Sequence, residues 1–413
     1  MTRTVLVHVG APKTGTSFVQ DVLFQHRDEL ASRGILYPAD RFDEHFLAAL
    51  DLMELPWGGL EKEAVGAWDR LAEKVRAWDG TVIVSHEILA TATRPQVRRA
   101  LESFGEDAEV HVVLSARDLV RQIPAEWQEN VKHRRVIGYR DFLDQITDPS
   151  RQGRLASWFW GVQEVPDILD RWGGKLPPER VHLVTVPKPG APRTLLWERF
   201  ASVLGIDPAE FSPESNRANP SLGVPESALV RRINERVNHG VLVNHRYREL
   251  VRELLVHRSL SHRRDGARLT LPPDVRAWAV QLSERWIDEL ARRGYDVIGS
   301  LDELRPDALP EGDAQAPSYA DPDHPDEEQV RAAALDSIVA LLVEASRLRD
   351  VEDGLREELA QAHRERDEAW AAANRRLVYR TKQRLVRAAD GSAAGRRLHQ
   401  VYRRVRGRSS RSA

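Results

Sequence analysis

The residues with the clearest chemical potential lie in a glycine-rich turn near the amino terminus. Gly10 and Gly15 enclose Lys13, and the hydroxyl residues Thr16 and Ser17 follow at once. A valine-rich stretch that predicts a strand precedes the turn, and an amphipathic stretch that predicts a helix follows it. The first amides of a helix have no intrahelical acceptor and can bind an anion, to which the hydroxyl and ammonium groups would add donors and charge. The sequence therefore predicts a site for phosphate or sulfate.

The position of the lysine separates two kinds of phosphate-binding loop. In a Walker loop the lysine directly follows the second glycine, and a hydroxyl residue comes next. Here Thr16 stands at the lysine position, and Lys13 lies two residues before Gly15. A nucleoside triphosphate site is therefore less favoured than another anion site. The structural alternative is a strand–turn–helix connection that contains a lysine by chance.

A second candidate anion site follows a later predicted strand. Arg117 comes soon after the strand predicted at residues 110–115, and Arg121 lies one helical turn beyond it on the same face. Planar guanidinium groups suit phosphate oxygens because they can donate two parallel hydrogen bonds. The structural alternative is a simple ion pair between Arg117 and Asp118 at the start of a helix.

Two candidate proton acceptors stand at the end of the strand predicted at residues 81–85. His86 and Glu87 follow this strand directly, and sites in open parallel sheets form at the carboxyl ends of strands. Consecutive side chains of an extended chain point to opposite sides, so we expect one of the two to face the site. Glu87 is the favoured base, because His86 would also suit a hydrogen bond to a substrate. The structural alternative is an interior histidine and a helix-capping glutamate. His45 is a third, weaker candidate.

The run from Pro12 to Ser17 resembles the 5′-phosphosulfate loop of sulfotransferases that use 3′-phosphoadenosine 5′-phosphosulfate (PAPS). The resemblance implies that the cofactor's 5′ end is held by Pro12, Lys13, Thr14, Gly15, Thr16 and Ser17. Lys13 would contact the sulfuryl group and the bridging oxygen. Arg117 and Arg121 would hold the 3′-phosphate. The family usually adds a serine eight residues after this first arginine, and here that position is Ala125.

The resemblance extends over about residues 1–300 and includes the run Trp127-Gln128-Glu129. It implies in-line transfer of a sulfuryl group from PAPS to a hydroxyl or amine of a carbohydrate, lipid or small-metabolite acceptor. Adenosine 3′,5′-bisphosphate (PAP) would be released, and no metal is expected. The catalytic residues would be Lys13, Glu87 and His86, and the acceptor would contact His45, Trp127 and Gln128. The alternatives are a nucleotide-dependent kinase with a phosphate loop and a nucleotide- or glycan-binding module without turnover.

Short valine-rich runs alternate with longer amphipathic stretches through the first 300 residues, as in a parallel sheet covered by helices on both faces. We expect a three-layer α/β/α fold with a central parallel sheet, of the P-loop NTPase-like sulfotransferase kind that the resemblance implies, followed by a C-terminal helical extension. Strands are predicted at residues 4–9, 81–85, 110–115 and 181–186. Helices are predicted at residues 16–32, 60–78, 95–104, 119–134, 194–204, 226–238, 247–255 and 274–293.

Composition divides the chain into four parts. We expect a sulfotransferase-like catalytic domain at residues 1–300, an acidic proline-rich linker at 301–329, a long helix at 330–373 and a basic, flexible tail at 374–413. The long helix carries a heptad seam, interrupted by Glu352, that consists of Ile338, Leu341, Ala345, Leu348, Leu355, Leu359 and Ala362. Such a seam is typical of a coiled coil, which would join copies of the chain into a homo-oligomer. A helix folded back onto the first domain is the alternative.

The tail concentrates the positive charge of the protein. Residues 375–413 contain 13 Lys and Arg residues against Asp390 alone, although the formal net charge of the whole chain is −2. Basic segments with regularly spaced apolar residues bind anionic membrane surfaces or polyanions. The alternative is a solvated tail that only aids solubility.

The remaining composition limits the class of protein. The 413 residues include no cysteine, which excludes disulfide frameworks, thiolate metal sites and cysteine nucleophiles. No apolar run approaches the roughly 20 residues of a membrane span. We therefore expect a cytoplasmic protein that contacts the inner membrane surface at most peripherally.

Overall fold

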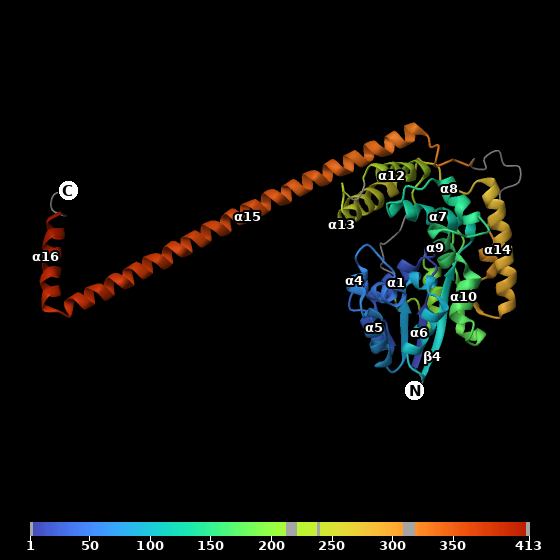
Figure 1. Ribbon diagram of the computed structural model, residues 1–413, viewed down its shortest axis with the longest axis horizontal. Helices are drawn as coiled ribbons and strands as arrows, with labels where there is room; N and C mark the ends of the chain where they lie inside the picture. The colour runs from blue at the N-terminus through green and yellow to red at the C-terminus, as the bar shows by residue number, and fades with distance from the viewer. Residues whose placement is uncertain (1–2, 212–220, 238–239, 309–318, 410–413) are drawn as a thin grey trace. The chain divides into compact units, whose positions relative to one another are not determined.

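The computed structural model describes residues 3–211, 221–237, 240–308 and 319–409. The chain divides into two compact units, Met1–Ala340 and Leu341–Ala413. The first unit combines a parallel sheet with helices, and the second unit is helical (Figure 1). The predicted α/β class with a C-terminal helical extension is thus confirmed.

The sheet of the first unit has six parallel strands in the order β2-β3-β1-β4-β5-β6. The strands are β1 (Arg3–His8), β2 (Ile35–Leu36), β3 (Thr81–Ser85), β4 (Ala108–Ala116), β5 (Val181–Thr185) and β6 (Asp296–Ile298). The four strands β1, β3, β4 and β5 are those that the sequence predicts. The two edge strands were missed because two or three residues are too few to show a period-2 pattern.

Helices cover both faces of the sheet, because alternate residues of each strand point to opposite faces. In β1, Leu6 packs against α1 (Thr16–Gln25), α2 (Arg27–Ser32) and α11 (Leu195–Leu204). Val5 and Val7 belong to the other core, with α5 (Ala67–Arg76), α6 (Arg94–Ser103), α7 (Leu119–Lys132) and α10 (Val165–Gly173). Full burial of an aliphatic side chain stabilises a fold by about 1.5–3 kcal/mol. The two cores make the expected three layers.

The remaining elements of the first unit complete this frame. They are α3 (Glu44–Met53), α4 (Glu61–Ala64), α8 (Tyr139–Thr147), α9 (Arg154–Gln163), α12 (Val224–Arg236), α13 (Asn244–Tyr247), a π-helix (Arg248–Ser259), α14 (Pro273–Arg293) and 3₁₀ turns at Glu87–Thr91, Pro178–Arg180, Leu260–His262 and Leu301–Leu304. The helix predicted at 16–32 breaks at His26, and the one predicted at 60–78 breaks before Gly66. Gly66 has a φ of 73°, which does not continue a right-handed helix.

The carboxyl ends of β3, β1 and β4 lie side by side. His8 is in register with Ser85, and beyond His8 the chain stays bonded to β4, since Ala11 N donates to Ser115 O at 2.9 Å. The turn that contains Lys13 therefore opens between the ends of two neighbouring strands. After β1 the chain crosses to β2 at one edge, whereas after β4 it crosses to β5 towards the other edge. Such divergence creates the crevice in which open α/β sheets bind ligands.

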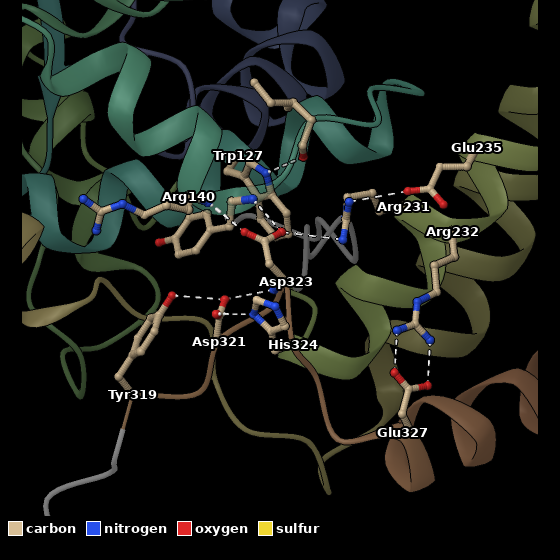
Figure 2. Close-up of polar contacts among 12 residues, drawn as sticks. Trp127, Arg140, Arg231, Arg232, Glu235, Tyr319, Asp321, Asp323, His324 and Glu327 are labelled. Carbon is tan, nitrogen blue, oxygen red and sulfur yellow. Dashed lines mark hydrogen bonds and ion pairs between the residues drawn. The ribbon is translucent and has the colours of Figure 1, made fainter.

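Part of the acidic stretch predicted as a linker lies against the first unit (Figure 2). Asp323 accepts hydrogen bonds from the backbone amides of Tyr139 and Arg140, both at 2.9 Å, at the start of α8. Its carboxylate also lies 3.5 Å from Arg231 Nη2 on α12. Asp323 therefore caps α8 from a distant part of the sequence. Residues 309–318 of the same stretch lie outside the described residues.

The long helix α15 (Glu327–Asp390) begins on the first unit and continues past the predicted boundary at residue 373. Arg232 donates two hydrogen bonds to Glu327, at 2.8 and 2.6 Å (Figure 2). Val330 and Ala333 of the same helix are buried. A second helix, α16 (Ala393–Ser409), follows in the basic segment. Across the described ranges, the chain contains no helix that is both long and apolar enough to cross a membrane.

We expect Asp323→Ala to destabilise the first unit. The substitution removes the acceptor for two helix-start amides, and replacing an N-cap residue by alanine costs about 0.5–2 kcal/mol. Urea unfolding followed by tryptophan fluorescence should show a lower midpoint. Asp367→Ala is the control, since the Asp367 side chain on α15 is 69% exposed and should change stability by less than about 0.5 kcal/mol. Equal midpoints for the two variants would contradict the capping role.

Candidate active site

The glycine-rich turn has a backbone that few sequences adopt. Lys13 has a φ of 63° and Gly15 a φ of 88°, both in the left-handed region that favours glycine. A Cβ atom on Gly15 would lie 2.4 Å from Leu196 Cδ2, so any other residue there would be both strained and crowded. Thr14 Oγ1 donates to Ala11 O at 2.5 Å and closes the turn. The turn therefore holds Lys13 in a defined place.

The start of α1 presents backbone donors. Within the described residues, no side chain caps this helix at Gly15, and its first turn contains no acidic residue. The first amide of α1 with a backbone acceptor is that of Phe18, which donates to Gly15 O at 3.0 Å. The amides of Thr16 and Ser17 precede it and have no acceptor in the described part of the chain. This arrangement matches the expected anion site at a helix start.

Lys13 is paired with a carboxylate that the sequence did not single out. Lys13 Nζ lies 2.6 Å from Glu129 Oε2 on α7, and both side chains are about four-fifths buried, with exposed fractions of 18% and 19%. Burial alone would raise the pKa of Glu129, but a hydrogen bond from His133 and the charges of Lys13 and Lys132 hold it well below its ordinary value. Glu129 is therefore ionised at neutral pH and orients the ammonium group.

Glu126 lies nearly one turn earlier on α7 and behaves differently. Burial raises the pKa of Glu126 to about 7; the charge of Lys13 opposes this rise and that of Glu129 adds to it. Gln163 Nε2 donates to Glu126 Oε2 at 3.3 Å. A carboxyl group that titrates near neutrality beside a lysine is typical of functional sites, because it can exchange a proton there.

The two arginines after β4 lie together. Arg117 Nε donates to Gln122 Oε1 at 2.9 Å, and Arg117 Nη2 donates to Arg121 O at 3.0 Å. Burial, together with the charge of Arg121, lowers the pKa of Arg117 to about 10. Arg121, rather than Arg117, pairs with Asp118. Arg121 Nη2 is buried and has no hydrogen-bond partner among the described residues. Two adjacent cations with an unsatisfied donor fit an anionic group with several acceptor oxygens.

Gln122 joins the two candidate anion sites. Its Nε2 donates both to the carbonyl oxygen of Pro12, in the glycine-rich turn, and to Gln163 Oε1 at 2.9 Å. Its Oε1 accepts from Arg117, and Gln163 in turn donates to Glu126. One side chain therefore fixes the turn, the arginine and the buried carboxyl group relative to each other.

His86 and Glu87 lie at the end of β3, against the same turn. A Cβ atom on Gly10 would lie only 3.1 Å from the carbonyl oxygen of Glu87. His86 Nδ1 accepts from Ile88 N at 3.3 Å, and burial lowers the pKa of His86, although the charge of Glu87 opposes this. The neutral ring therefore carries its proton on Nε2 and donates there.

Glu87 is ionised at neutral pH. Burial opposes its ionisation, but its interactions with His86, Gln20 and Lys13 outweigh burial and lower its pKa. Gln20 Nε2 donates to Glu87 Oε2 at 3.1 Å and so holds the carboxylate from α1. Of the two candidates, Glu87 has the form that can accept a proton, and His86 has the form that can donate a hydrogen bond.

The three residues predicted to contact the acceptor are all buried. Trp127 Nε1 donates to Ile137 O at 3.2 Å, and Gln128 Nε2 donates to Leu222 O at 2.6 Å. Both side chains therefore hold α7 against neighbouring backbone segments. His45 Nδ1 accepts from a backbone amide of β3, while its Nε2 is buried with no partner among the described residues. The structure thus brings together the turn, the arginine pair and the end of β3. Acceptor contact by the three buried residues stays a prediction.

Sequence reasoning missed the polar face of α7. Gln122, Glu126 and Glu129 follow one another at spacings of four and three residues, which place them on one face of α7. That spacing was a usable signal, because the stripe begins five residues after the candidate phosphate-binding Arg117. A polar stripe on an isolated helix nevertheless indicates a solvent-facing side, so only the packing of the turn against α7 reveals its role.

We expect Glu126→Gln to stabilise the protein increasingly as pH rises. The pKa of Glu126 is about 7 in the folded chain and about 4.3 in an unfolded one. Between these values the folded state binds a proton that the unfolded state releases, so the parent chain loses stability as pH rises through this window. The glutamine variant avoids this loss, which is at most about 4 kcal/mol.

Melting temperatures of parent and Glu126→Gln, measured from pH 5 to pH 8, should therefore diverge, with the variant higher above pH 7. Glu102→Gln, at an exposed position of α6, is the control and should run parallel to the parent. A pH-independent difference between the parent and Glu126→Gln would show that the pKa of Glu126 is not raised.

Comparisons with known proteins add little to this geometry. No family model matches the chain, and no curated protein matches it. Among solved structures, the chain is similar to the crystal structure of a sulfotransferase from Alicyclobacillus acidocaldarius. The identity is 19%, the match covers 60% of this chain and 95% of that chain, and the TM-score is 0.37. The similarity is weak, and we take nothing further from it.

Proposed function

We propose that the first unit is a PAPS-dependent sulfotransferase that transfers a sulfuryl group to a hydroxyl or amine of a carbohydrate, lipid or small-metabolite acceptor. The observation that supports this best is the presence of two separate groups of anion-binding residues at the carboxyl ends of neighbouring strands. One is the start of α1 with Lys13, and the other is the pair Arg117 and Arg121 at the end of β4. A nucleotide with anionic groups on both its 3′ and 5′ positions needs two such sites, whereas a triphosphate chain needs one.

The donor set of the chain fits PAPS. The amides of Thr16 and Ser17 and the ammonium group of Lys13 would hold its 5′ end. Arg117 and Arg121 would hold its 3′-phosphate, and the unpartnered Nη2 of Arg121 supplies a buried donor for it. Ala125 offers no hydroxyl group at the position where the family usually has serine, so the two guanidinium groups would carry this contact.

The residues around the glycine-rich turn have separate roles in the proposed reaction. When bound, PAPS supplies an electrophilic sulfuryl group attached to a stable leaving nucleotide. Lys13 contributes a fixed positive charge that stabilises negative charge developing at the 5′ end, and Glu129 keeps its ammonium group oriented. Glu87 takes the proton of the attacking hydroxyl or amine, and His86 Nε2 donates a hydrogen bond to the acceptor. Proton transfer to a positioned base contributes about 10²–10⁴-fold to such a rate.

We expect PAP to stabilise the protein selectively. A ligand of the folded state present at 100 times its Kd adds about 2.7 kcal/mol to the free energy of unfolding. Thermal unfolding with PAP, with ATP plus magnesium, and with neither should therefore show a higher Tm only with PAP. Preference for ATP would favour a kinase, and PAP binding without transfer to any of a broad panel of acceptors would favour a non-catalytic module.

Lys13→Ala extends this test to the reaction. Transfer of labelled sulfuryl groups from PAPS should fall by at least about 10²-fold, as on loss of a donor that stabilises transition-state charge. The Tm without ligand should fall, because Glu129 loses a largely buried partner, but the far-UV circular dichroism should stay that of the parent. Lys62→Ala is the control, because Lys62 is an exposed lysine of α4. Near-normal transfer by Lys13→Ala would refute the assigned role.

We expect Glu87→Gln to lower kcat by about 10²–10⁴-fold while the PAP-induced rise in Tm is retained, because the variant loses a base but no cofactor contact. His86→Gln should mainly raise KM for the acceptor. The two variants should be compared with the same labelled PAPS and the best acceptor of the panel. A large loss of kcat in His86→Gln with normal kcat in Glu87→Gln would reverse the two roles.

A further inference from the structure

The helix α15 exposes a regular stripe of large apolar side chains. The stripe consists of Ile338, Leu341, Leu348, Leu355 and Leu359, whose exposed fractions lie between 40% and 60%. Their spacing alternates between three and four residues when Ala345, Glu352 and Ala362 are included, so all eight fall on the a and d positions of a heptad. An apolar stripe of this width on a helix normally faces another element.

In the described part of the second unit, the apolar side chains of the stripe from Leu341 to Leu359 are exposed. Its described residues form α15 beyond Ala340 and α16. The stretch of α15 that carries the stripe contains Gly354, and glycine is a poorer helix former than alanine. Ion pairs along the same helix, such as Arg347 with Glu344 and Arg356 with Glu352, stabilise an isolated helix only weakly. A continuous helix here is best explained by association.

We propose that residues 338–362 form a parallel, two-stranded coiled coil with a second copy of this chain. The heptad places Ile338, Ala345, Glu352 and Leu359 at a, and Leu341, Leu348, Leu355 and Ala362 at d. Leucine at three of the four d positions is typical of parallel dimers. This inference does not depend on the reaction that the first unit catalyses.

The charges beside the seam select the parallel orientation. In a parallel pair, each g residue faces the e residue five positions later in the partner helix, and these pairs would be Glu344 with Arg349 and Glu358 with His363. In an antiparallel pair, g faces g and e faces e. Glu344 would then face Glu358, and Arg349 would face Arg356, so both contacts would repel. Charge complementarity therefore exists only in the parallel arrangement.

Glu352 is the weak layer of the seam. Its carboxylate lies 2.7 Å from Arg356 Nη2 and 3.3 Å from Arg349 Nη1 of the same helix, so it is neutralised without a partner chain. A single polar residue at an a position fixes the register of a coiled coil at a cost in stability. With three and a half heptads and one polar layer, we expect a dimer with a Kd in the micromolar range. This Kd corresponds to a binding free energy of about −8 kcal/mol.

Sedimentation velocity of the full chain from 1 to 100 μM should test the association. The apparent mass should rise from 46.8 kDa towards twice that value. Leu348→Ala with Leu355→Ala should give a monomer throughout. Val339→Ala with Val343→Ala is the matched control, because these residues are 59% and 66% exposed at b and f positions of the same helix, and this variant should associate like the parent. Alanine favours helix formation in both variants, which far-UV circular dichroism would check.

Glu352→Leu should tighten the dimer at least tenfold. A parent chain that stays monomeric at 100 μM, a dimer that survives both leucine substitutions, or a Glu352→Leu variant that is no tighter would overturn the proposal.

Orientation has its own test, because the chain contains no cysteine. A Leu341→Cys variant should form a disulfide-linked dimer rapidly on mild oxidation, since a parallel pair places the two thiols beside each other. A dimer that forms but does not cross-link would show that the helices are not parallel.

Discussion

β1 lies between β3 and β4, and the hydrogen bonds along both of its edges decide where the chemistry of this chain can occur. The backbone hydrogen bonds between β1 and β4 continue beyond β1 to Ala11, so the start of the glycine-rich turn is fixed relative to β4. His86 and Glu87 follow β3, and Arg117 follows β4, so all three lie at the carboxyl ends of strands beside this turn. Helix α1 begins at this turn, so its uncapped first amides lie at the same crevice.

Charge balance is the second constraint, and it follows from the first. Lys13, Arg117 and Arg121 are cations in a largely buried place, which is unfavourable unless each finds a partner. Glu129 neutralises Lys13, and Asp118 pairs with Arg121. Among the described residues, the hydrogen-bond partners of Arg117 are neutral, and one donor of Arg121 has no partner. A bound anion beside the two arginines would complete this balance.

The local part of this site was predictable from the sequence. Four of the strands, the glycine-rich turn between a strand and a helix, and the arginine after β4 occur where the pattern predicts them, because each is encoded within a few consecutive residues. The helix breaks at His26 and Gly66 were not predicted, since amphipathic periodicity continues across them. The edge strands β2 and β6 were too short to detect, and their pairing depends on the neighbouring strands.

The sequence by itself determined the α/β class, the position of the glycine-rich turn and the separation of an acidic body from a basic tail. Only the tertiary structure decided that Gln122 ties the turn to Arg117, that Glu129 pairs with Lys13 and that Asp323 caps α8 from 184 residues away. The physical reason is the range of the interactions. Periodicity and turn chemistry act between neighbours, whereas buried polar groups find their partners through packing, which no single segment specifies.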